Sequence, residues 1–119
     1  MLPEAGDIAW IEFDPVKGTE RAGRRPGLIL SSVDYHQKSG RAVVCPISSN
    51  VRQWPFNVTL PSGLKTVGVV MVDQIRAIER GARIFAIIEH APSDLMSEVR
   101  GRLAALLGFD FMSPPVRMD

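Results

Sequence analysis

Six short apolar segments constrain the fold of this chain more than any other feature, because they recur every 12 to 19 residues between turn-forming stretches. They span residues 7–13, 26–33, 41–48, 55–60, 67–73 and 82–90. The first, DIAWIEF, alternates with a period of two and is rich in aromatic and β-branched side chains, as is typical of a β-strand. Residues 34–40 are expected to form a turn that joins a hairpin, and residues 61–65 and 76–81 are expected to separate the later strands. Short strands at this spacing predict a small antiparallel barrel or sandwich.

Residues 92–108 are the one segment with a clear helical pattern. We expect Ser93 to cap the start of this helix and Gly108 to end it. Apolar residues at helical spacing form a single stripe, at Leu95, Val99, Leu103 and Leu106. This stripe predicts that the helix packs across the sheet.

The length and charge of the chain limit its domain organisation and its partners. With 119 residues it is expected to form one domain, 1–108, followed by a C-terminal tail, 109–119. A net charge of +1 excludes nucleic-acid binding through a uniformly basic surface. One segment is nevertheless biased, with Lys17, Arg21, Arg24 and Arg25 set against Glu20 alone. This local charge favours an anionic partner.

Cys45 is the single cysteine, so it cannot form an internal disulfide, which fits a reducing compartment. The chain has no apolar run of about 18 residues and no signal-peptide pattern at its N-terminus. We therefore expect a cytoplasmic protein that does not enter a membrane.

Arg25 stands where the basic segment meets the second predicted strand. Pro26 fixes the backbone beyond it, so the guanidinium can be held rigidly at this point. A planar guanidinium can bind a phosphate through two hydrogen bonds. An alternative that the sequence leaves equally open is that Arg25 pairs with Glu20 or Asp14 and only pins the segment.

A second polar cluster, CPISSN, closes the third predicted strand. Its Ser48, Ser49 and Asn50 present hydroxyl and amide groups, a combination that most often forms only a turn. If the second and third strands pair as a hairpin, however, Arg25 at the start of one lies beside Ser48 at the end of the other. A cation beside a hydroxyl can stabilise charge that develops on a phosphate.

Other motifs that carry chemistry are missing from the sequence. There is no Cys/His cluster with zinc-site spacing, no P-loop and no dinucleotide-binding fingerprint. His36 and His90 could act as acid and base on RNA only if the fold brought them together, and their positions in a predicted turn and before the helix disfavour this. We therefore expect neither a metal nor a cofactor.

Four stretches, in order, resemble the MazF/PemK family of toxin endoribonucleases: GDIAWIEFDPVKGTERAGRRPGLIL, CPISSN, VMVDQIRAI and the helix ending in LLG. The resemblance covers residues 6–108. It implies an SH3-like barrel of about six to seven antiparallel strands with a C-terminal α-helix. It also implies a homodimer that cuts single-stranded RNA such as mRNA at short sequence motifs, without a metal, and that a cognate antitoxin neutralises.

The resemblance further implies the reaction and the residues that carry it. The ribose 2′-OH would attack the adjacent phosphate and leave a 2′,3′-cyclic phosphate and a 5′-OH end. The family's catalytic arginine falls on Arg25, and its catalytic threonine falls on Ser48, where a serine keeps the hydroxyl. Glu20 could orient Arg25 or take the 2′-OH proton, and Ser49 is the alternative hydroxyl. RNA contacts are expected at Lys17, Arg21, Arg24, Asn50, Arg52 and Gln74.

Two other interpretations stay open from the sequence. The same small barrel occurs in toxins of the CcdB type, which inhibit DNA gyrase by binding and catalyse nothing. Arg25 would then be structural, and the C-terminal helix would be the interaction surface. The third interpretation is a barrel that binds RNA without cutting it. Incubation with a long RNA in EDTA distinguishes a ribonuclease from these two alternatives, because only a ribonuclease produces cut RNA ends.

Overall fold

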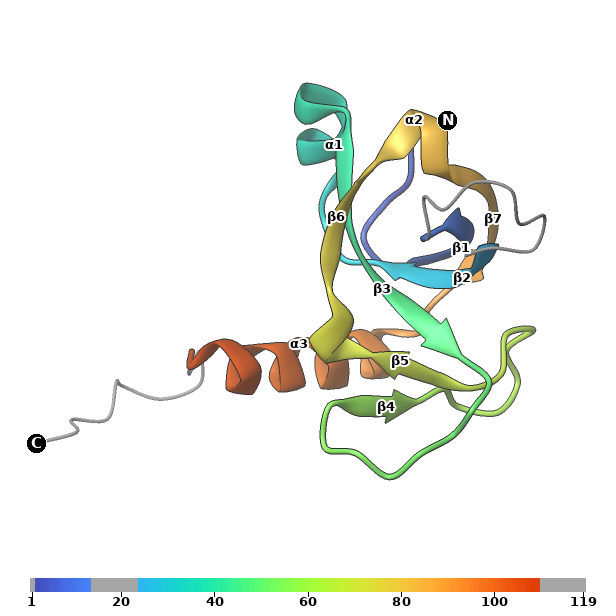
Figure 1. Ribbon diagram of the computed structural model, residues 1–119, viewed down its shortest axis with the longest axis vertical. Helices are drawn as coiled ribbons and strands as arrows, with labels where there is room; N and C mark the ends of the chain where they lie inside the picture. The colour runs from blue at the N-terminus through green and yellow to red at the C-terminus, as the bar shows by residue number, and fades with distance from the viewer. Residues whose placement is uncertain (1, 14–23, 110–119) are drawn as a thin grey trace, which may run out of the picture.

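The computed structural model describes residues 2–13 and 24–109, which form a bent, seven-stranded antiparallel sheet with a C-terminal helix (Figure 1). The strands are β1 Asp7–Glu12, β2 Arg24–Ile29, β3 Arg41–Ser48, β4 Asn57–Thr59, β5 Val69–Met71, β6 Arg76–Glu79 and β7 Ile84–His90. The helices are α1 Val33–Ser39, the 3₁₀ turn η1 Val72–Gln74, α2 Arg80–Arg83 and α3 Ser93–Leu107. The mainly antiparallel β fold with a C-terminal helix predicted from the sequence is confirmed.

The long strand β3 organises the sheet, because it pairs with three other strands along its length. Its first residues pair with β6, its middle pairs with β2, and its end pairs with β5. The hydrogen-bonded order is β4-β5-β3-β2-β1-β7, with β6 beside the start of β3. The sheet therefore bends along β3, where pairing with β6 and β2 ends and pairing with β5 begins.

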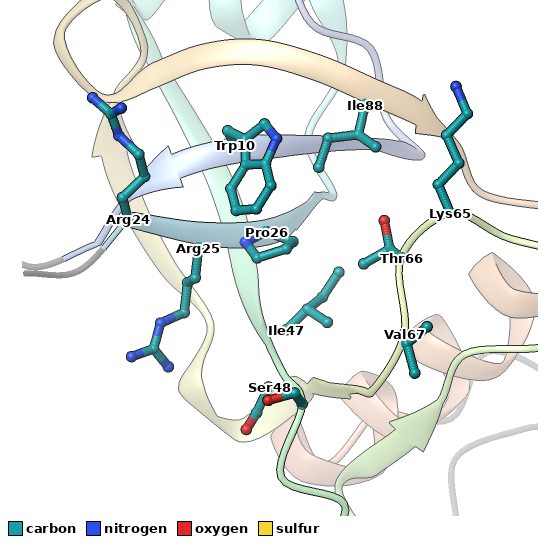
Figure 2. A pocket seen from close by; sticks show the side chains of 11 residues that line it. Trp10, Arg24, Arg25, Pro26, Ile47, Ser48, Lys65, Thr66, Val67 and Ile88 are labelled. Carbon is teal, nitrogen blue, oxygen red and sulfur yellow. The ribbon is translucent and has the colours of Figure 1, made fainter. Parts of the chain in front are cut away.

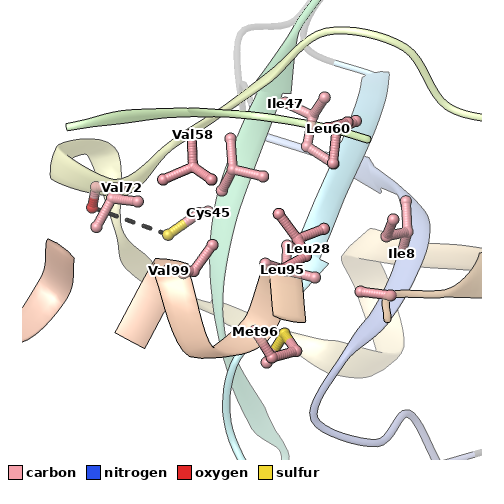
Figure 3. Close-up of a cluster of buried hydrophobic side chains, with 12 residues drawn as sticks. Ile8, Leu28, Cys45, Ile47, Val58, Leu60, Val72, Leu95, Met96 and Val99 are labelled. Atoms are coloured by element: carbon pink, nitrogen blue, oxygen red, sulfur yellow. Dashed lines mark hydrogen bonds between the residues drawn. The ribbon is translucent and has the colours of Figure 1, made fainter. Parts of the chain in front are cut away.

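Two hydrophobic cores lie on opposite faces of β1, β2 and β3. Successive strand residues point to opposite faces, so Leu28 and Ile29 contribute to different cores. The first core packs under α3 and consists of Ile8, Leu28, Cys45, Ile47, Val58, Leu60, Val70, Val72, Ala91, Leu95, Met96 and Val99 (Figure 3). The second consists of Ala9, Ile11, Phe13, Ile29, Ala42, Val44 and Ile78. Burial on both faces explains the continuous apolar runs in these strands.

Cys45 is fully buried in the first core, where its thiol donates a weak hydrogen bond to the carbonyl oxygen of Val72 (Figure 3). Desolvation by burial, and then the charge of Asp73, raise the pKa of this thiol to about 12. The thiolate needed for reactivity is therefore strongly disfavoured, and the side chain acts as a small apolar group.

The predicted turn at 34–40 is wrong, because most of this stretch forms the short helix α1. Ser32 caps the helix by accepting a hydrogen bond from the amide of Tyr35, and Asp34 lies in the first turn. Gly40 ends it with φ +74°, in the left-handed region that favours glycine. β2 and β3 still pair as neighbours, although a helix joins them in place of a turn.

The predicted separator at 76–81 is also wrong, since it contains β6 and the start of α2. β6 is short and mostly exposed, so it lacks the alternating pattern of a half-buried strand. At the C-terminal helix, Pro92 and not Ser93 occupies the capping position, while Gly108 ends the helix as predicted. No helix in the described part of the chain is long and apolar enough to span a membrane.

Candidate active site

A pocket of about 650 Å³ opens where β3 leaves β2 and turns to pair with β5 (Figure 2). The last β2–β3 pair is Gly27 with Pro46, and the next residue of β3, Ile47, pairs with Val70 of β5. The pocket is lined by three cationic side chains, three hydroxyl side chains and five apolar ones. These are Arg24, Arg25 and Lys65; Ser48, Ser49 and Thr66; and Trp10, Pro26, Ile47, Val67 and Ile88.

Arg25 and Ser48 line this same pocket, as the sequence predicted. The pairing of β2 with β3 ends at Gly27 and Pro46, and Arg25 and Ser48 each lie two residues beyond this last pair. In Figure 2 the Arg25 side chain extends towards the Ser48 end of β3, while that of Arg24 extends the other way. The pocket therefore places a guanidinium and a hydroxyl around one opening.

The two neighbouring arginines differ in how they are held. The Arg24 guanidinium lies 3.9 Å from the centre of the Phe85 ring, a cation–π contact with β7. None of the ion pairs among the described residues includes the exposed Arg25. Among the described residues, Arg24 is therefore held by an aromatic ring, whereas Arg25 is in no ion pair.

The two candidate hydroxyls also differ. Ser48 Oγ accepts a hydrogen bond of 3.0 Å from the amide of Asn50, which fixes the oxygen and leaves its O–H free to donate. Ser49 is exposed and lines the same pocket. Of these two serines, only Ser48 also lines a second pocket of about 340 Å³. Ser48 is thus a lining residue that the two pockets share.

The second pocket gathers three of the predicted RNA contacts, namely Asn50, Arg52 and Gln74. Its other polar residues include Gln53, Asn57 and Asp73, and its aromatic residue is Trp54. The Trp54 indole N–H donates to Asp73 Oδ2 at 2.9 Å, which holds the half-exposed ring in place. Amide groups and an aromatic face are the features that single-stranded RNA-binding sites use to contact bases.

Glu89 of β7 supports the wall of the first pocket that is formed by residues 65–67. Its carboxylate accepts hydrogen bonds from the amides of Lys65 and Thr66, at 2.9 and 2.8 Å, and from the Thr66 hydroxyl at 2.7 Å. Desolvation by burial raises the pKa of Glu89, but these hydrogen bonds and the Lys65 charge outweigh it and lower the pKa below its ordinary value of 4.5. The wall is therefore held by a charged carboxylate at neutral pH.

Acid should release this wall. Because the pKa of Glu89 is lower in the folded protein, the stabilisation is present at neutral pH and is lost as the pH falls through the lowered value. We expect the amide proton resonances of Lys65 and Thr66 to shift together in an NMR titration, with a midpoint below 4.5. Amide shifts that stay constant down to the pH of global unfolding would contradict this.

Three predicted site residues, Lys17, Glu20 and Arg21, lie outside the described residues. The sequence interpretation missed Trp10, Lys65, Thr66 and Val67, which line the first pocket. Trp10 pairs with Pro26 across β1 and β2, so the strand register could have placed it beside Arg25. Nothing in the local pattern of 65–67 marked this segment, because tertiary contacts alone bring it to the pocket.

The two histidines have separate structural roles. His36 is fully buried; its Nδ1 donates to the carbonyl oxygen of Pro3 at 2.7 Å, and its Nε2 bonds Ser31 Oγ at 2.6 Å. His90 Nδ1 pairs with Asp7 Oδ1 at 3.0 Å. Among residues 2–13 and 24–109, no three His, Cys, Asp or Glu side chains are grouped closely enough to hold a metal ion.

The family model and the individual proteins that this chain resembles all describe MazF or PemK toxins. A family model described as the PemK-like, MazF-like toxin of type II toxin–antitoxin systems matches residues 4–107. The endoribonuclease toxin MazF of Escherichia coli K12 is 40% identical over 82 residues, which cover 69% of this chain and 73% of that protein. The endoribonuclease PemK of Escherichia coli is 37% identical over 108 residues, covering 87% and 81%.

Solved structures extend this likeness to three dimensions. The crystal structure of MazF from Deinococcus radiodurans has a TM-score of 0.83 and 40% identity, and the match covers 92% of this chain and 99% of that one. A MazE–MazF structure from the same organism has a TM-score of 0.80 and 37% identity over the same shares. The family match, residues 4–107, includes every described residue that lines either pocket.

Proposed function

Because this chain belongs to the family of PemK-like and MazF-like toxins of type II toxin–antitoxin systems, we propose that it is an endoribonuclease that cuts single-stranded RNA at short sequence motifs. The family membership predicted from the sequence is confirmed. Relatives that are 40% and 37% identical are named endoribonucleases, which supports the proposed activity.

One observation supports the site of this activity most directly, namely that Arg25 and Ser48 line one pocket at the point where β2 and β3 separate. An exposed guanidinium can bind two oxygens of a phosphate at once. The apolar side chains of the pocket, Trp10 foremost, offer a surface on which a base can stack. The pocket thus combines a phosphate contact with a base contact, as a nuclease requires.

The proposed reaction is an intramolecular transfer at phosphorus. The ribose 2′-oxygen forms a bond to the adjacent phosphorus, and the bond from phosphorus to the 5′-oxygen breaks. The 2′-OH loses its proton and the departing 5′-oxygen gains one, so the products are a 2′,3′-cyclic phosphate and a 5′-OH end. Arg25 stabilises the charge that develops on the phosphoryl oxygens, because a guanidinium stays protonated and is a poor base.

Ser48 and Glu20 complete the proposed machinery. The Ser48 hydroxyl, with its oxygen held by the Asn50 amide, donates a hydrogen bond to the same phosphate. Ser49 is the alternative hydroxyl. Glu20, outside the described residues, is our candidate for taking the 2′-OH proton or for orienting Arg25.

The RNA is proposed to pass over Ser48, with bases in the pockets on either side. Asn50, Arg52 and Gln74 of the second pocket are the proposed contacts on one side, and Arg24 on the other. Lys17 and Arg21 complete the proposed contacts. Hydrogen-bonding side chains in a confined pocket can distinguish bases of single-stranded RNA, which would account for cleavage at particular motifs.

Incubation of the purified protein with a long RNA in millimolar EDTA tests this function. We expect discrete fragments with 5′-OH and 2′,3′-cyclic phosphate ends, because the proposed reaction uses side chains and no metal. The 5′ ends are read by kinase labelling with and without prior phosphatase treatment, followed by sequencing, and the 3′ ends by mass spectrometry of the fragments. Intact RNA would favour the CcdB-type or the RNA-binding interpretation, and activity restored only by Mg²⁺ would contradict the metal-free reaction.

A cognate antitoxin and a second copy of this chain are the proposed partners. Related structures are described as complexes of MazF with MazE, which supports an antitoxin partner, and a cytoplasmic location would fit such a pair.

The dimer gives a further prediction. A domain of this size gains stability from burying apolar surface in a symmetric interface. Light scattering at micromolar concentration should give twice the 13.1 kDa mass of one chain. A monomeric mass over the whole concentration range would contradict the proposed dimer.

A further inference from the structure

Residues 65–67 form a short wall of the first pocket (Figure 2). Glu89 holds the start of this wall. Three hydrogen bonds converge on the one carboxylate, two of them from consecutive backbone amides. Hydrogen bonds to a charged acceptor are stronger than neutral ones, and together they fix the backbone direction of the segment. Glu89 pairs with Ile8 in the sheet, so it ties the wall to a strand with a buried core.

The chain directly after this wall is held against the backbone of Ser48, the residue that carries the proposed catalytic hydroxyl. Gly68 has φ +133°, and a Cβ built on it would lie 2.1 Å from the carbonyl oxygen of Ser48. Any side chain at this position would displace the Ser48 backbone, so the close approach needs glycine. The wall is therefore fixed between Glu89 on β7 and Ser48 on β3, and its position is coupled to that of Ser48.

The wall presents an apolar side chain to the pocket. Val67 is 76% exposed, although valine is usually buried, and it lies on the opposite side of the pocket from Trp10 in Figure 2. Trp10 is itself 43% exposed, and Figure 2 shows Pro26 and Ile47 between Trp10 and Val67. An apolar slot of this kind suits a flat nucleobase, since stacking and van der Waals contacts are available from more than one side.

We propose that Glu89 is a positioning residue for the substrate: it holds residues 65–67 so that Val67 forms one wall of the slot for the nucleobase beside the scissile phosphate. This inference rests on the proposed ribonuclease function. The 65–67 wall thereby helps to select that base, because the width of an apolar slot determines which ring fits. Glu89 acts only through the wall and does not touch the reacting atoms.

The test compares Glu89→Gln with the wild-type protein on RNA randomised on both sides of its cleavage site. The glutamine side chain has the same size as that of glutamate, but its NH₂ group is a hydrogen-bond donor. The three groups that bond the Glu89 carboxylate are also donors, so the NH₂ group cannot replace the carboxylate oxygen. We expect KM for a short RNA to rise about 10-fold, kcat to change by less than about threefold, and preference for the adjacent base to weaken. Glu4→Gln removes the same charge from an exposed carboxylate that does not line the pocket, and it should behave as wild type.

Each outcome decides the inference. A folded Glu89→Gln protein with lower thermal stability but unchanged KM and base preference would show that Glu89 only supports the fold, and would overturn it. If Glu89→Gln does not fold, Val67→Ala decides, because it trims the wall and leaves the Glu89 hydrogen bonds in place; unchanged base preference would again overturn the inference. If the wild-type protein leaves the RNA intact, the proposed function fails and this inference fails with it.

Discussion

Arg25→Ala should lower the rate of RNA cleavage by at least about 10²-fold, because it removes the charged donor aimed at the developing phosphorane charge. Arg25 is exposed, at the start of β2, and the ion pairs among the described residues do not involve it. The free energy of unfolding should therefore change by less than about 1 kcal/mol. Single-turnover cleavage and thermal unfolding of the same preparation separate the two effects.

Matched variants identify which feature of the site matters. Arg25→Lys should recover little activity, because one ammonium cannot reproduce the planar, two-donor geometry of the guanidinium. Ser48→Ala should lose less than Arg25→Ala, since a neutral hydroxyl makes a weaker hydrogen bond than a charged group. Ser49→Ala is the control for Ser48, as both line the first pocket. If folded Arg25→Ala protein cuts RNA at the parental rate, Arg25 only pins the backbone.

The strands that were easiest to predict from the sequence are the longer ones. β1, β2, β3 and β7 are long enough to show their apolar composition, and α3 shows its stripe through Leu95 and Val99, both of which are buried. β6 and α1 could not be predicted in this way, because both are short and mainly exposed. Their conformations depend on pairing with β3 and on a capped turn at Ser32.

The site was predictable only as far as strand pairing could be predicted. Arg25 and Ser48 stand at the two ends of strands that pair, so an antiparallel register places them together. The 65–67 wall is different: it reaches the pocket through the Glu89 hydrogen bonds and the close approach of Gly68 to Ser48. These contacts join residues more than 19 positions apart, and no local pattern encodes them.

A single 2′-deoxy sugar immediately upstream of the cut should abolish cleavage at that bond, because it removes the proposed nucleophile. The protein should still bind this RNA, since the phosphates and the base stacking surfaces are unchanged. Arg25 and Trp10, the proposed phosphate and base contacts, do not depend on the missing hydroxyl. Cleavage is followed on gels with end-labelled RNA, and affinity by fluorescence anisotropy with the same oligonucleotide.

The matched control carries the 2′-deoxy sugar one nucleotide downstream, where the 2′-oxygen takes no part in the reaction, and it should be cut at nearly the parental rate. A fall in cleavage rate that both deoxy substrates share would reflect altered sugar conformation or a lost hydrogen bond to a 2′-OH, and not a missing nucleophile. Cleavage of the upstream deoxy substrate at the same bond would mean that water attacks the phosphorus directly. In that case the product would be a linear phosphate, and the part proposed for Arg25 would be to stabilise attack by water in place of the ribose oxygen.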